Sequence, residues 1–99
     1  MDGPVTLWAR DGLTVEARLD SGGRLTISGH DLSGRFYDEY EYWLYVAPED
    51  VPLVVRTLGG SEGDPVLPLL ETHGEMIVRT GEQRWLRSLG IEPGFANWH

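Results

Sequence analysis

The sequence predicts an α+β fold: an antiparallel sheet of four to five strands in the N-terminal half, followed by two to three helices packed on one face. Apolar and polar residues alternate through most of the first 46 positions, which is the pattern of strands with one buried face. After position 46 the pattern changes to helical spacing with start and stop signals. Strands followed by helices are typical of α+β proteins, and 99 residues suit one domain, residues 1–99.

Clear turn signals separate the first three predicted strands. Residues 5–10 and 13–19 alternate on either side of Asp11-Gly12, a dipeptide typical of tight hairpins. The Ser-Gly-Gly turn at residues 21–23 ends the second strand, and alternation resumes over residues 25–29. These spacings favour an antiparallel meander.

The fourth predicted strand, about residues 39–46, combines aromatic rings with acids. Four of its side chains share the face that we expect to meet the helices: Tyr40, Tyr42, Leu44 and Val46. The opposite face carries acids and aromatic rings: Glu39, Glu41, Trp43 and Tyr45. We expect Trp8 of the first strand to join this second face, because it alternates out of phase with Leu7.

The first helical stretch has proline and acids in its opening turn and ends at Gly59-Gly60. Pro52 lacks a backbone N–H, so this helix must begin just before it. A second stretch starts with Asp64 as N-cap and Pro65 at the first helical position.

Glycines divide and end the second helical stretch. Gly74 and Gly81 each weaken a helix by about 1 kcal/mol, so we expect a break near one of them. Gly90 is placed to cap the C-terminal end. The last five residues, 95–99, form either a short final strand or a tail docked on the core.

Composition limits the classes of partner and of site. The net charge is −8 and all eight basic residues are arginine, so the chain repels phosphate and we expect no nucleic-acid partner. Cysteine is absent, which excludes disulfides and thiol chemistry. The N-terminal residues lack the pattern of a signal peptide, and no apolar run reaches the length of a membrane span. We expect a soluble, cytoplasmic protein.

Two segments of the sequence contain a histidine near other residues capable of chemistry. Ser28, His30 and Asp31 lie close in sequence, but a catalytic triad draws its members from separate parts of a fold. We therefore interpret Asp31 as a turn cap. We interpret Gly29, between Ser28 and His30, as a bulge or strand end. His73 lacks a second ligand at helical spacing and is interpreted as a partly buried histidine. The sequence thus predicts no catalytic residue, metal or cofactor, and no enzyme.

The acidic and aromatic strand face instead suits a protein interface, in which aromatic rings anchor a partner and acids attract a basic one. The predicted partner-binding residues are Asp38, Glu39, Glu41, Trp43 and Tyr45, with Glu49 and Asp50 at the rim. Alternatives remain: a solvated acidic face, a face covered by the C-terminal tail or by a second copy in a homodimer, or a ligand cleft containing His30, Asp31 and tyrosines.

Four segments carry a resemblance: "LTISGHDL", "YEYWLYVAPEDVPLVVRTLGG", "LLETHGEMIV" and "WLRSLGI". Together they resemble a group of small, acidic, largely uncharacterised actinobacterial proteins, and the resemblance implies no catalytic residues. By size and charge alone the chain is similar to immunity proteins of bacterial toxin systems. We expect a protein-binding module that neutralises or regulates a partner protein, most plausibly a toxin. The alternatives are a homodimeric structural protein or, with less support, a ligand-binding or enzymatic domain.

Overall fold

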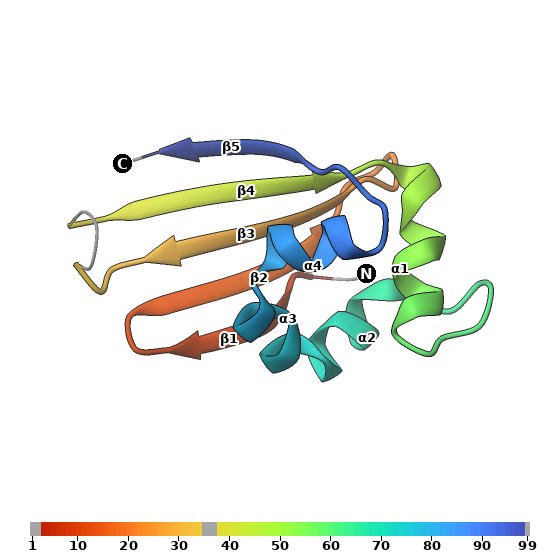
Figure 1. The fold of residues 1–99 in the computed structure, drawn as a ribbon, viewed down its shortest axis with the longest axis horizontal. Helices are drawn as coiled ribbons and strands as arrows, with labels where there is room; N and C mark the ends of the chain where they lie inside the picture. The colour runs from red at the N-terminus through yellow and green to blue at the C-terminus, as the bar shows by residue number, and fades with distance from the viewer. Residues whose placement is uncertain (1–2, 35–37, 99) are drawn as a thin grey trace.

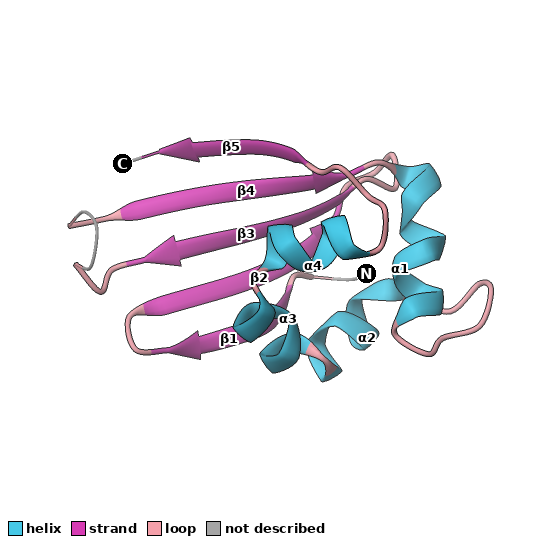
Figure 2. Cartoon of the chain, viewed as in Figure 1, coloured by secondary structure: helices cyan, strands magenta, loops and turns pink. Residues whose placement is uncertain are grey.

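The computed structural model describes residues 3–34 and 38–98, and it confirms the predicted α+β fold. Five strands form one antiparallel sheet in the order of the sequence. The helices gather on one face of this sheet (Figure 1), so that the protein has two layers (Figure 2). The strands are β1 (Val5–Arg10), β2 (Leu13–Leu19), β3 (Leu25–Asp31), β4 (Tyr40–Val46) and β5 (Gly94–Trp98).

The C-terminal segment supplies the fifth strand. β5 pairs antiparallel with β4 and forms one edge of the sheet, which decides between the predicted strand and the predicted docked tail. His99, the last residue of that segment, lies outside the described residues. The other four strands lie in the N-terminal half, as the alternating pattern predicts.

In the described residues, four α-helices follow β4 after a short 3₁₀ turn, η1 (Pro48–Asp50). They are α1 (Val51–Thr57), α2 (Val66–Thr72), α3 (Gly74–Thr80) and α4 (Glu82–Ser88). The second predicted stretch yields three helices, because it breaks at both Gly74 and Gly81. Within the same residues, no helix is both long and apolar enough to cross a lipid bilayer.

The helix ends show where the start and stop signals are correct. α1 begins directly before Pro52, and Gly90, at φ 90°, ends α4 with a hydrogen bond from the Ile91 N–H to the Leu86 carbonyl. The predicted cap of α2 is wrong. That helix starts after Pro65, and the Asp64 carboxylate instead accepts a hydrogen bond from the Ser61 N–H at 2.7 Å.

The hydrophobic core lies between the helices and the sheet face that they cover, called here the helix face. Its largest fully buried side chains are Leu25, Ile27, Leu44, Leu70, Ile77, Leu86, Val15, Val46 and Val54. Each such side chain contributes about 1.5–3 kcal/mol when it leaves water. Leu44 and Val46 are both in this core, which confirms the predicted orientation of β4.

Trp8 lies on the helix face, so the prediction that it joins the opposite face is wrong. The β1–β2 register shifts at Leu7, which places Trp8 opposite the buried Val15. Such a bulge reverses the alternation of the residues that follow it. The Trp8 ring packs against the core, with the guanidinium carbons of Arg10 and Arg79 at 3.9 and 5.6 Å from its centroid.

Tyr42 connects the sheet to α4. Its hydroxyl donates a hydrogen bond to a carboxylate oxygen of Glu82, a residue that is only 8% exposed. The Tyr42 ring covers Gly29 so closely that a Cβ there would overlap it. The interpretation of Gly29 as a bulge or strand end is wrong, because it lies inside β3 with unbroken pairing on both sides. The glycine makes room for the ring.

We predict that the Tyr42–Glu82 hydrogen bond makes the protein lose stability at high pH. Burial and the Glu82 carboxylate raise the pKa of Tyr42 above its ordinary value of 10.0. The unfolded chain therefore releases a proton above pH 10 that the folded protein keeps. The stabilisation is complete below pH 10 and is lost as the pH rises further.

The free energy of unfolding of the wild type should then fall by up to about 1.4 kcal/mol per pH unit above pH 10, and less steeply in Tyr42→Phe. Urea unfolding between about pH 8 and pH 11 measures both slopes. Equal slopes would contradict a proton held by Tyr42.

Candidate functional site

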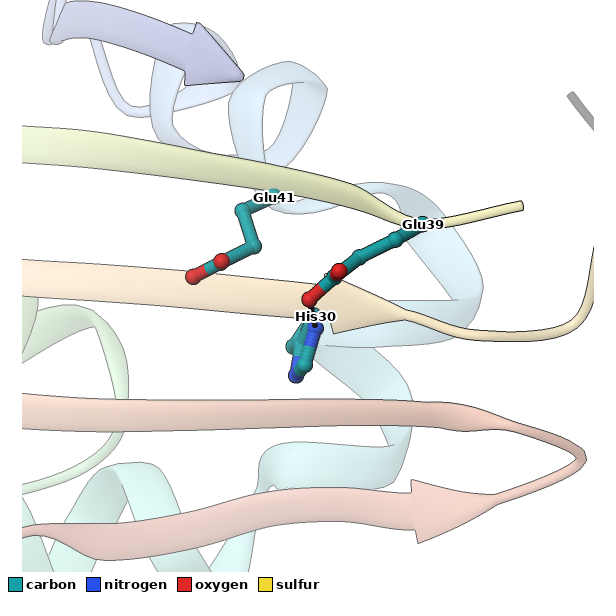
Figure 3. Close-up of side chains that lie close together, drawn as sticks. All are labelled: His30, Glu39 and Glu41. Carbon is teal, nitrogen blue, oxygen red and sulfur yellow. Dashed lines mark hydrogen bonds and ion pairs between the residues drawn. The ribbon is translucent and has the colours of Figure 1, made fainter. Parts of the chain in front are cut away.

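The sheet face turned away from the helices, called here the open face, holds the candidate site. Strand register places these described residues on it: Thr6, Thr14, Glu16, Arg18, Thr26, Ser28, His30, Glu41, Trp43, Tyr45 and Trp98. Figure 3 looks onto this face, with the helices behind the sheet. In β3 and β4 the side chains of this face are partly exposed, whereas Leu25, Ile27, Leu44 and Val46 on the helix face are buried.

Trp43 lies at the centre of the open face. Along the direction of pairing, Glu16, Ser28 and Trp43 form one row across three adjacent strands. Trp43 is partly exposed and lies outside the hydrophobic core, beside Ala96 of β5. An aromatic anchor must be accessible to a partner, which the sequence alone cannot show, and the partly exposed Trp43 ring meets this condition.

The predicted acids divide between the two ends of β4. Glu39 and Glu41 lie at its start, beside the exposed Asp38, whereas Glu49 and Asp50 lie in η1 after its end. The last five residues of β4, residues 42–46, lie between Glu41 and η1 and span roughly 17 Å. Glu49 and Asp50 therefore do not border the same patch as Glu39 and Glu41.

Tyr45 lies at the less acidic end of the open face. The Arg24 guanidinium carbon is 4.6 Å from its ring centroid, and Arg24 also pairs with Asp20 at 3.2 Å. Hydrogen bonds from the backbone N–H groups of Arg24 and Gly22 lower the pKa of Asp20. Because Arg24 covers part of Tyr45, this ring is a weaker anchor than Trp43.

Three potential metal ligands converge at the acidic end. His30 lies directly opposite Glu41 across the β3–β4 pair, and its Nε2 is 2.5 Å from an oxygen of Glu39. One ligand atom from each of the three residues lies within 4.8 Å of the others. Figure 3 shows both carboxylates leaning from the β4 side toward β3, with Glu39 reaching the imidazole.

A polar hollow of ≈ 300 Å³ adjoins this cluster. It lies on the open face and is lined by Thr14, Glu16, Arg18, Ser28, Gly29, His30, Glu41 and Trp43. The hollow is shallow, since strand side chains rather than loops form its walls. It can take a side chain from a partner or a small polar group.

The Ser28, His30 and Asp31 segment does not assemble a triad. Ser28 and His30 face the open side, but Asp31 pairs with Tyr40 on the helix face. Asp31 accepts a hydrogen bond from the Ser33 N–H at 2.8 Å, which confirms its predicted role as a turn cap. His73 lies at the junction of α2 and α3, partly buried, as predicted.

Trp98 joins the open face as part of β5, the final strand that was one of the two predicted alternatives for the C-terminal segment. It pairs with Glu41 across β4 and β5 and is 54% exposed. Phe95, three residues earlier, is 50% exposed on the other side of the same strand, near the start of α4. The open face thus carries two tryptophan rings, the partly exposed Trp43 in the middle of β4 and the exposed Trp98 beside Glu41.

No family model, curated protein or solved structure matches this chain. The class of protein therefore has to be inferred from the two-layer fold and from the chemistry of the open face.

Proposed function

We propose that the protein is a binding module whose open face docks a basic protein, in the manner of a cytoplasmic immunity protein that neutralises a toxin. The observation that carries this proposal is the partly exposed Trp43, bordered by carboxylates on a sheet face that none of the described helices covers. Aromatic rings surrounded by polar groups are the usual energetic centres of protein interfaces.

Charge supports a basic partner. The chain has a net charge of −8, and Glu16, Glu39 and Glu41 bring carboxylates to the open face around Trp43 and Trp98. Arg10, Arg79 and Arg87 are engaged in ion pairs with acids off the open face, and Arg24, beside Tyr45, is paired with Asp20. A basic protein is attracted to this acidic end by long-range electrostatics, which raises its association rate and makes binding sensitive to salt.

A second candidate function is self-association, and the edge strand β5 favours it. β5 ends the sheet and carries the exposed rings of Phe95 and Trp98. An edge strand without lysine or proline is open to pairing with another copy. Sedimentation over a wide range of concentrations separates this function from the first, because a homodimer doubles the mass without any partner.

We predict that Trp43→Ala removes partner binding without unfolding the protein. The tagged protein is used to capture partners from its own host, and bound proteins are identified by mass spectrometry at low and at high salt. We expect one stoichiometric basic protein, retained by the wild type, reduced at high salt and lost by Trp43→Ala and by Glu41→Gln.

Two controls lie off the open face: Phe95→Ala, which removes an aromatic ring that is 50% exposed on the other side of the sheet, and Glu71→Gln, which neutralises an exposed acid on α2. Both should capture the partner as the wild type does. Capture that is equal in Trp43→Ala and the wild type would contradict docking on the open face. Recovery of the protein's own chain alone would favour self-association.

A further inference from the structure

We propose that His30, Glu39 and Glu41 form a binding site for a first-row divalent metal ion, of which Zn²⁺ is the best match. This site lies on the open face, but it does not depend on a protein partner. Strand pairing in the sheet places His30 of β3 opposite Glu41 of β4, and Glu39 lies in the bend directly before β4.

The structure places one imidazole nitrogen and two carboxylates close to one another. Their ligand atoms lie within 4.8 Å of one another, and His30 Nε2 is already 2.5 Å from Glu39. Ligands of a tetrahedral zinc ion are about 3.3 Å apart, given metal–ligand bonds of about 2.0–2.1 Å. Small rotations of two long, partly exposed glutamate side chains close the difference.

Charge balance also favours a dication. The cluster brings the Glu39 and Glu41 carboxylates close together beside a single imidazole. A divalent ion bound to a neutral imidazole and two carboxylates compensates both charges at once. Because the residues are only partly buried, the loss of hydration on forming this site is small.

The ligand types select the class of metal. Mg²⁺ and Ca²⁺ prefer sites made wholly of oxygen, whereas an imidazole nitrogen favours Zn²⁺, Co²⁺ and Ni²⁺. Three protein ligands leave at least one position for water or for a group from another molecule. The polar hollow lined by His30 and Glu41 provides space for that fourth ligand.

The test is a calorimetric titration of Zn²⁺ into protein that carries no histidine tag. We expect saturable binding of one ion, weakened at least about tenfold in His30→Ala and in Glu41→Gln. Two variants serve as controls: Glu16→Gln, which removes an acid of the same hollow outside the cluster, and His73→Ala, which removes a histidine at the α2–α3 junction. Both should bind Zn²⁺ as the wild type does.

Circular dichroism is used to check that each variant is folded. If His30→Ala is unstable, Glu41→Gln still tests the site, because glutamine has nearly the same shape as glutamate. Titration with Co²⁺ adds a visible absorption band that reports coordination by the protein. The proposal is overturned if the wild type shows no saturable Zn²⁺ binding, or if both His30→Ala and Glu41→Gln retain wild-type affinity. Equal affinity for Ca²⁺ and Zn²⁺ would also overturn it, since an acidic surface without an imidazole ligand behaves that way.

Discussion

Gly29→Ala should destabilise the protein by about 3–5 kcal/mol, a large part of the total stability of a domain of this size. A Cβ at this position would overlap the Tyr42 ring, which cannot stay where it is. Displacing the ring empties part of the core and leaves the buried Glu82 without its hydroxyl donor. The cost therefore resembles that of deleting Tyr42 itself.

Urea unfolding measures this effect, and Gly22→Ala is the matched control, because Gly22 lies in an exposed turn where a Cβ has ordinary contacts. The double variant Gly29→Ala/Tyr42→Ala isolates the cause. Once the ring is removed, the new methyl group should cost little, so the double variant should be about as stable as Tyr42→Ala alone. Additive losses would contradict a direct conflict between residue 29 and the ring.

Gly74→Ala should destabilise the protein by about 2 kcal/mol or more, although alanine is the better helix former by about 1 kcal/mol. Gly74 opens α3 and lies against the backbone of Leu7 in β1, where a Cβ would overlap main-chain atoms. A backbone neighbour cannot rotate away as a side chain can. Either α3 or the bulged strand must therefore move.

The urea midpoint of Gly74→Ala should fall, while the dependence of the unfolding free energy on urea concentration stays the same. That result would mean that stability has changed and the compactness of the native and unfolded states has not. Glu71→Ala is a suitable control, because it replaces an exposed residue of the neighbouring helix with the same helix former. A gain in stability for Gly74→Ala, as helix propensity alone predicts, would contradict the close packing of α3 on β1.

The fold could be predicted from the sequence because its signals are local. The Asp11-Gly12 turn and the alternation of β4 each depend on neighbours in the chain, and both are confirmed, with positive φ at both turn residues. The same alternation fails at Trp8. A bulge at Leu7 has no glycine or other local mark, and it arises where α3 approaches the backbone of β1.

The candidate site could be predicted only in part, because its local features can be read from the sequence and its contacts between strands cannot. Which residues of β4 share a face follows from their spacing, so Glu41 and Trp43 were identified correctly as members of one face. The convergence of His30 on Glu39 and Glu41 depends on the register between β3 and β4, which the alternation within either strand does not reveal. Position 29 likewise requires glycine because of the Tyr42 ring on the neighbouring strand, a contact that the sequence does not reveal.

The rate at which Trp43→Ala dissociates from the captured basic partner tests the proposed function most directly. If Trp43 is the central anchor of the open face, its removal should cost about 2 kcal/mol of binding and raise the dissociation rate roughly 30-fold, with folding stability nearly unchanged. Phe95→Ala should dissociate at the wild-type rate. A Trp43→Ala complex as long-lived as the wild type would show that the partner binds elsewhere on the protein.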